Sequence, residues 1–139
     1  RSLTHLDVSH NNLRALPSEL GLLSGLEVIK CRSCQLTGTL PTEIGACTKL
    51  ETLAIATNSI GGTIPTEIGQ LSTSCRYLDL GVNLITGTIP SEVGTLSRLE
   101  TLILSWNDLS GWLPSELGQL SSLQGIFLWR GNQQLRDCF

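Results

Sequence analysis

The chain repeats itself at a fixed period, and this constrains its fold more than any other feature. Its five prolines fall in one register, at Pro17, Pro41, Pro65, Pro90 and Pro114, so that the spacings are 24, 24, 25 and 24 residues. A glutamate stands two positions after every proline, and a glycine stands four positions after it. Three registers that recur together indicate a short unit copied in tandem, in which each copy stacks on the next one.

Alignment on the prolines divides residues 1–139 into five full copies and a sixth that degenerates. The full copies begin at residues 3, 26, 50, 75 and 99, and the sixth begins at residue 123. The one extra residue of the third spacing falls in the polar stretch 72–74, where a loop absorbs it. Because the first residues already lie inside a copy, and because stacked arrays need polar caps at both ends, we interpret the chain as an excerpt of a longer array. The excerpt alone is then expected to be marginally stable or to self-associate through its uncovered ends.

Each copy opens with a pattern of alternating apolar residues, as at Leu102 and Leu104, which predicts a short strand with one buried face. An asparagine closes the strand in most copies, at Asn11, Asn58, Asn83 and Asn107. Its amide can satisfy backbone groups of neighbouring coils. The Ser or Thr after each proline predicts the start of a short helix, with the hydroxyl as its cap and the next glutamate near the positive end of the helix dipole. We therefore interpret the row of glutamates as structural.

These residues resemble the plant-type leucine-rich-repeat family, whose hallmark L-x-G-x-[IL]-P stands at 36–41, 60–65, 85–90 and 109–114. The first copy lacks the glycine, and the last copy departs further, with Gly131 in the asparagine position. The resemblance implies an α/β solenoid, a right-handed superhelix with one parallel sheet on its concave face and short helical or irregular segments opposite. It also implies an extracellular or cell-surface origin, in a receptor-like kinase or receptor-like protein ectodomain or in an inhibitor similar to polygalacturonase-inhibiting proteins.

Four of the five cysteines fit the repeat. Cys31, Cys47 and Cys75 occupy apolar positions. Cys34 takes the asparagine position, which tolerates Cys in this repeat type. Since a small buried hydrophobe explains each of them, we expect these four thiols to be unpaired. Cys138 lies outside the pattern and could pair with a cysteine of a cap, so its disulfide state stays open.

Several functions are not supported by the sequence. The balance of 12 acidic and 9 basic residues argues against a nucleic-acid footprint, and no apolar run is long enough to span a bilayer, so we expect no membrane contact within this segment. His5, Asp7 and Ser9 share one strand face, but residues two apart on a strand are about 6.6–6.8 Å apart. A nucleophile and its base need roughly 2.6–3.2 Å. We therefore predict no enzyme activity, no metal and no cofactor.

The open face of the predicted sheet is the candidate site, for recognition of a protein or peptide ligand. The candidate ligand-binding residues gather in the C-terminal half: Tyr77, Asp79, Ile103, Trp106, Phe127, Trp129 and Arg130. The polar N-terminal half supplies a secondary set: His5, Asp7, His10, Lys30 and Arg32. Aromatic residues are only 4% of the chain, so their concentration on one open face favours an interface. The resemblance agrees, because variable strand residues carry the ligand contacts in that family.

Two alternatives accompany this interpretation. Phe127 and Trp129 lie in the degenerate last copy and could instead contact a missing repeat or cap. The second alternative is adsorption to ice or another surface through a ladder of threonine hydroxyls on the flank, from Thr37, Thr39, Thr63, Thr86 and Thr88. Neighbouring coils lie about 4.8 Å apart, which would make the ladder regular. Ser110 and Trp112 interrupt it in the fifth copy.

Overall fold

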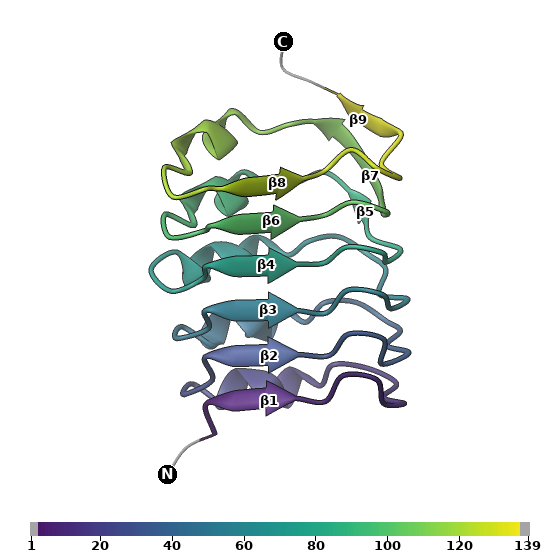
Figure 1. The fold of residues 1–139 in the computed structure, drawn as a ribbon, viewed down its shortest axis with the longest axis vertical. Helices are drawn as coiled ribbons and strands as arrows, with labels where there is room; N and C mark the ends of the chain where they lie inside the picture. Colours follow the sequence, from purple (N-terminus) through teal and green to yellow (C-terminus); the bar gives the residue numbers. More distant parts are fainter. Residues whose placement is uncertain (1–2, 137–139) are drawn as a thin grey trace.

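Six short strands stack into one parallel sheet in the computed structural model, which describes residues 3–136. They are β1 (His5–Asp7), β2 (Val28–Lys30), β3 (Thr52–Ala54), β4 (Tyr77–Asp79), β6 (Thr101–Ile103) and β8 (Gly125–Phe127). Each strand pairs with the next one in this order, from the N-terminal end at the bottom of Figure 1 to the C-terminal end at the top. Successive copies of the sequence are thus successive coils, here numbered 1 to 6, and the predicted sheet is confirmed.

Short 3₁₀ helices lie on the opposite side of the coils. They are η1 (Ser18–Leu22), η2 (Thr42–Ala46), η3 (Thr66–Leu71), η4 (Ser91–Thr95) and η5 (Ser115–Gln119). The predicted hydroxyl cap is wrong, because the proline is the capping residue and the Ser or Thr is already the first helical residue. In η4, for example, Pro90 has an extended ψ of 144°, and the Ser91 hydroxyl donates to the Glu92 carboxylate at 3.2 Å.

A second, smaller parallel sheet runs along the flank of the later coils. It consists of β5 (Thr86–Gly87), β7 (Asp108–Trp112) and β9 (Gln134–Arg136), in that order. These strands lie on the right of Figure 1, after the turn that follows each strand of the main sheet. None of the helices in residues 3–136 is long and apolar enough to cross a bilayer.

The core is one continuous stack of apolar side chains between the main sheet and the helices. Ile29, Leu53, Leu78 and Leu102 form its inward row on the main sheet, and each is fully buried. Burial of such a side chain contributes about 1.5–3 kcal/mol to folding. Ile126 continues this row in β8 but is 44% exposed, because no further coil follows β8 within residues 3–136.

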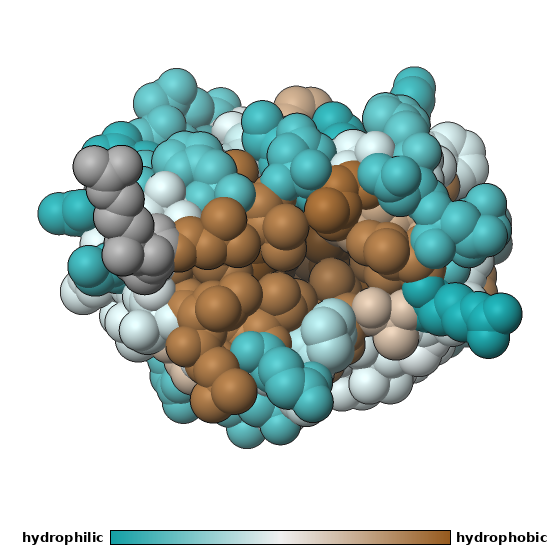
Figure 2. Space-filling model, turned by 90° about the horizontal axis from the view of Figure 1, so that it is seen from below, coloured by the Kyte–Doolittle hydropathy of each residue, from teal (hydrophilic) through white to brown (hydrophobic). Residues whose placement is uncertain are grey.

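The ends of the described array expose apolar surface. Figure 2 shows the end at β1, where hydrophobic residues form a patch rimmed by hydrophilic ones. Leu22 is 81% exposed at this end, and Leu3, Leu13 and Leu23 are also exposed. This apolar surface is available for the self-association that the sequence led us to expect. Sedimentation over a range of concentrations measures whether the chain associates.

The four cysteines within the repeat are buried and free, as predicted. The Cys34 thiol donates to the Val8 carbonyl at 3.1 Å, and the Cys47 thiol donates to the Leu20 carbonyl at 3.3 Å. Burial raises the pKa of Cys31 and of Cys75 from 9.0 to about 12. Cys138 lies outside the described residues.

These buried thiols predict how stability depends on pH. We expect the free energy of unfolding to fall as the pH rises from about 9 to about 12. In this window the unfolded chain loses the thiol protons while the folded chain retains them, so that the unfolded state binds fewer protons and stability decreases with pH. Urea titrations at pH 8 and pH 10.5 measure the change. The double variant Cys31→Ala, Cys75→Ala should show a smaller decrease, and an equal decrease would contradict burial of these thiols as its cause.

Candidate functional site

The concave face is the open side of the six-stranded sheet, where two rows of side chains point outward. The first row runs through His5, Val28, Thr52, Tyr77, Thr101 and Gly125, and the second through Asp7, Lys30, Ala54, Asp79, Ile103 and Phe127. Ile103 pairs directly with Phe127, which lies 24 residues later, one period of the repeat. The strands therefore bring side chains about 24 positions apart in the chain into contact across one surface.

The aromatic part of this face is accessible. Trp106 is 54% exposed, and Phe127 and Trp129 are exposed to a similar degree. Tyr77 and Ile103 lie on the same face and are half-buried. A shallow hollow of about 220 Å³ continues this surface to the C-terminal end of the array, lined by Ser105, Ile126, Phe127, Leu128, Trp129 and Arg130. Trp129 thus lies at the border between the concave face and the uncovered end, and both interpretations of its role stay open.

Coil 6 corrects one detail of the sequence interpretation. Asn132 rather than Gly131 occupies the asparagine position, because its side chain is buried and donates to the Leu104 carbonyl at 2.9 Å, and its oxygen accepts the Leu109 N–H at 2.9 Å. The last copy therefore contains one additional residue before its asparagine. Arg130 lies beside Trp106, since its carbonyl accepts the Trp106 N–H.

A larger hollow of about 560 Å³ occupies the N-terminal half of the concave face. It is lined by Asp7, Ser9, His10, Lys30, Arg32, Thr52, Ala54 and Tyr77. Ala54 is almost completely buried, and so is Ala56 two residues later. These small side chains on coil 3 leave a depression between the longer side chains of coils 2 and 4. The depression contains most of the secondary set of predicted residues.

An ion pair that was not predicted from the sequence crosses this depression. Arg32 on coil 2 donates to the Asp79 carboxylate on coil 4 at 2.8 Å, and the Asp79 side chain is only 1% exposed. Asp79 also accepts the Gly81 N–H at 3.0 Å and the Tyr77 hydroxyl at 3.5 Å. Asp79 is therefore not an open contact residue but one held under Arg32 and Tyr77. The signal was present in the two alanines of coil 3, which give the arginine room to reach across.

We expect Arg32→Ala to lower the free energy of unfolding by about 1–2 kcal/mol, because the buried Asp79 carboxylate would lose its cation. Breaking a fully buried pair costs about 3–5 kcal/mol, and the half-exposed Arg32 guanidinium is partly screened by water. Arg76→Ala is the matched control, since its 2.7 Å pair with Glu100 lies at the surface and should contribute less than about 1 kcal/mol. Chemical denaturation measures both variants, and equal effects would contradict the structural role of the Arg32 pair.

The polar residues of coil 1 are occupied locally. Hydrogen bonds from Ser9 lower the pKa of Asp7, and Lys30 on the neighbouring strand adds a smaller contribution. Nδ1 of His5 lies 3.0 Å from the Thr4 hydroxyl. The Asp7 carboxylate thus accepts hydrogen bonds from Ser9 and does not orient the imidazole of His5. This agrees with the distance between alternate residues of a strand, which is too long for such a contact. His10 and Lys30 are exposed at the rim of the large hollow.

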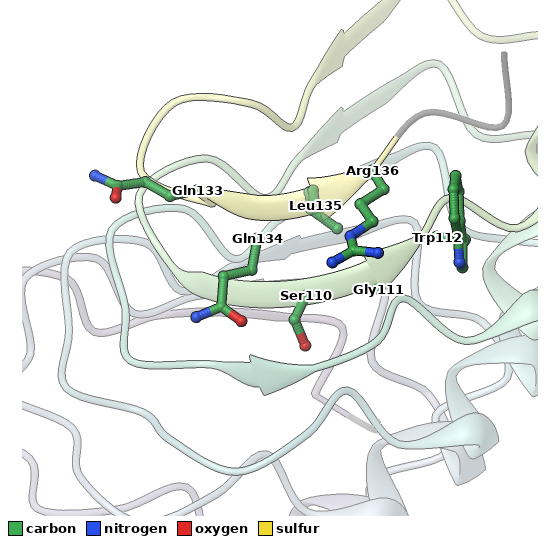
Figure 3. A pocket seen from close by; sticks show the side chains of 7 residues that line it. All are labelled: Ser110, Gly111, Trp112, Gln133, Gln134, Leu135 and Arg136. Atoms are coloured by element: carbon green, nitrogen blue, oxygen red, sulfur yellow. The ribbon is translucent and has the colours of Figure 1, made fainter.

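The flank carries a third hollow, of about 370 Å³, between β7 and β9. It is lined by Ser110, Gly111, Trp112, Gln133, Gln134, Leu135 and Arg136, whose side chains are drawn in Figure 3. The Arg136 guanidinium lies over the Trp112 ring, 5.8 Å from its centroid. A cation–aromatic contact thus occurs on the flank, and Trp112 stands where Thr39, Thr63 and Thr88 stand in earlier coils.

Comparison with known proteins decides the family. A family model of the leucine-rich repeat matches residues 2–23, 49–71, 74–96 and 98–120, which together exceed half of the chain. The chain belongs to the leucine-rich-repeat family. No curated protein matches this leucine-rich-repeat chain in sequence.

Solved structures similar to this leucine-rich-repeat chain include plant receptor ectodomains. The ectodomain of the receptor kinase GASSHO1/SCHENGEN3 from Arabidopsis thaliana, in complex with CASPARIAN STRIP INTEGRITY FACTOR 2, has a TM-score of 0.89 and 34% identity, over 97% of this chain and 16% of that one. The ectodomain of the Arabidopsis thaliana receptor kinase SOBIR1 has a TM-score of 0.90 and 28% identity, over 98% and 74%. A plant ice-binding protein has a TM-score of 0.80 and 30% identity, over 96% and 42%. The plant-type resemblance is confirmed, and the chain spans about one sixth of the GASSHO1/SCHENGEN3 ectodomain.

Proposed function

We propose that this chain is a non-catalytic recognition module that binds a protein or peptide ligand on its concave face. The observation that carries the proposal is the aromatic surface of coils 5 and 6, where Trp106, Phe127 and Trp129 are exposed and Phe127 pairs with the half-buried Ile103. Large aromatic side chains and arginine are the residues that anchor protein interfaces. Arg130 adds an exposed cation beside this surface. Asp79 contributes indirectly, by holding Arg32 and Tyr77 in place.

The similar structures support this proposal. The ectodomain of GASSHO1/SCHENGEN3 was solved with CASPARIAN STRIP INTEGRITY FACTOR 2 bound, and that of the receptor kinase HAESA with the peptide hormone IDA and the co-receptor SERK1. By analogy with these ectodomains, we place the chain in the extracellular part of a receptor-like protein, or in an extracellular inhibitor of the same family. Rigid shape complementarity suffices for such binding and requires no cofactor.

Panning a library of random twelve-residue peptides on the immobilised chain tests the proposal. We expect the selected peptides to bind more weakly to Phe127→Ala and equally well to Trp112→Ala, as measured by fluorescence anisotropy. The two variants remove similarly exposed aromatic rings from different faces, so Trp112 is a matched control. Peptides that depend on Trp112 and not on Phe127 would move the site to the flank, and a failure to select any peptide would contradict peptide recognition.

Ice adsorption is the second candidate, and the similarity to a plant ice-binding protein favours it. Thr37, Thr39, Thr63, Thr86 and Thr88 are exposed on the flank. The threonine row is short, however, because Ser110 and the bulky Trp112 replace it in coil 5. We expect no thermal hysteresis in a freezing assay of the purified chain, and a measurable hysteresis that Thr63→Tyr abolishes would make adsorption the better assignment.

A further inference from the structure

The outer face of the second sheet carries a cluster of side chains that the proposed function does not use. In the pairing of β7 with β9, Ser110 lies opposite Gln134, and Trp112 lies opposite Arg136. Because alternate residues of a strand point to the same side, these four side chains lie together on one face. Figure 3 draws them where they line the hollow of about 370 Å³, here called the flank hollow.

The fold does not require the indole ring of Trp112. This side chain is 61% exposed and lies outside the hydrophobic core. Coils 2 to 4 make the same turn with a threonine at this position, at Thr39, Thr63 and Thr88. The contact of Trp112 with Arg136 lies at the surface, where a cation–aromatic pair contributes little to stability. An aromatic ring beside a few polar groups in a hollow is instead typical of a ligand site.

The Arg136 guanidinium is a cation that is available to a ligand. It lies 5.8 Å from the centroid of the Trp112 ring, on the same hollow. Within residues 3–136 it forms no ion pair, whereas Arg32 and Arg76 each pair with a carboxylate. Asp108, the acidic residue of β7, stands four positions before Trp112, which is about 13 Å along the strand. A ligand carboxylate can therefore bind Arg136 through two parallel N–H donors.

Ser110 and Gln134 supply hydrogen-bonding groups to the same hollow. Gln134 is exposed, so its amide offers donors and an acceptor to a ligand. The Ser110 hydroxyl donates to the Gly87 carbonyl at 3.5 Å, which leaves its oxygen as an acceptor. The exposed Thr88 adjoins this hollow, since a Cβ on Gly111 would lie 2.8 Å from its methyl group. The polar surface thus continues from the hollow into coil 4.

Together these groups fit a sugar acid. A pyranose ring has an apolar face of C–H groups that can pack on an indole, and hydroxyls at its edge that donate and accept hydrogen bonds. A uronic acid unit adds a carboxylate to this ring. A small aromatic acid could also contact Trp112 and Arg136. It would, however, leave polar groups such as the Gln134 amide dehydrated and without partners, which weakens binding.

We propose that the flank hollow binds a uronic acid unit of an acidic saccharide, with the carboxylate on Arg136, the ring on Trp112 and the hydroxyls on Ser110 and Gln134. Its volume of about 370 Å³ lies within the range of small-molecule sites, about 300–1,000 Å³. The net charge of −3 gives no long-range attraction for an anion, so Arg136 has to supply the selectivity for the acid. This site lies on a different face from the proposed peptide site and does not depend on it.

Two matched sugar hexamers test the proposal on the purified chain. The acidic probe is a fluorescently labelled hexamer of β-1,4-linked mannuronate. The uncharged probe is β-1,4-mannohexaose with the same label, in which a hydroxymethyl group replaces each carboxylate. We expect the wild type to bind the acidic hexamer at least about ten-fold more tightly than mannohexaose at physiological ionic strength. Fluorescence anisotropy measures both affinities.

Three variants assign the binding to the flank hollow. Trp112→Thr introduces the residue that coils 2 to 4 carry, so it should keep the melting temperature and weaken binding of the acidic hexamer at least about ten-fold. Arg136→Gln should lower the affinity for the acidic hexamer to that for mannohexaose. Lys30→Gln is the matched control, because it removes an exposed cation from the concave face and should leave both affinities unchanged.

Five other outcomes overturn the inference. The absence of saturable binding rejects a saccharide site, and equal affinities of the wild type for the two hexamers reject recognition of the carboxylate. Weaker binding to Lys30→Gln with unchanged binding to Trp112→Thr assigns the hexamer to the concave cations. A lower melting temperature and unchanged affinity of Trp112→Thr mean that the ring stabilises the contact between coils 5 and 6. Displacement of the hexamer by benzoate at a similar concentration assigns the hollow to small aromatic acids.

Discussion

Asn107→Ala should lower the free energy of unfolding by about 3 kcal/mol or more. The buried Asn107 side chain donates to the Leu80 and Leu104 carbonyls, both at 3.0 Å, and its oxygen accepts the Ile85 N–H at 2.9 Å. Alanine would leave these backbone groups of two coils without partners, and each buried unsatisfied group costs about 1–3 kcal/mol. Since the whole stability of a domain is about 5–15 kcal/mol, this substitution should remove a large part of it.

Asn11→Ala is the control for this experiment. Asn11 occupies the same position in coil 1, but it is exposed and bonds only to the Val8 and Ser9 carbonyls of its own coil. Its replacement should cost less than about 1 kcal/mol, because water can satisfy the exposed carbonyls. Urea unfolding followed by circular dichroism measures both variants. Similar losses in the two would mean that the asparagine stabilises the turn within a coil rather than the contact between coils.

Trp106→Ala should weaken binding of a selected peptide by about 2 kcal/mol, which is about 30-fold. The reason is that an exposed indole at the centre of a binding face buries a large area on association. The fold should be little affected, since Trp106 is 54% exposed and outside the core. Calorimetric titration and thermal unfolding of the same samples measure the two effects, with Trp112→Ala as the aromatic control on the flank.

Trp129→Ala in the same experiments separates the two interpretations of the last coil. A lower affinity at unchanged melting temperature assigns Trp129 to the ligand site. A lower melting temperature at unchanged affinity assigns it to contacts at the C-terminal end of the array, where Ile126 is also exposed. If Trp106→Ala lowers the melting temperature as strongly as Asn107→Ala does, Trp106 is structural and the proposed site is wrong.

The sequence alone predicted the stacking of the coils, because a tandem repeat places equivalent residues side by side. The pairing of Ile103 with Phe127 follows from their spacing of 24 residues. The role of the asparagines was equally predictable, since an amide at a fixed position in each coil faces the backbone of its neighbour. The burial of Cys31, Cys47 and Cys75 followed from their apolar positions in the repeat.

The tertiary structure alone decided contacts that skip a coil and turns that depend on one residue. Repeat alignment relates adjacent coils, so it could not show that Arg32 reaches Asp79 over the small side chains of coil 3. Alignment also placed Gly131 in the asparagine position, whereas the structure places Asn132 there. Gly131 has a φ of 86°, and a Cβ at this residue would lie only 2.5 Å from the Trp106 Cα, so glycine is required. The positive φ of Val82, 51°, likewise becomes visible only in the folded chain, since a residue type does not reveal the φ that its neighbours impose.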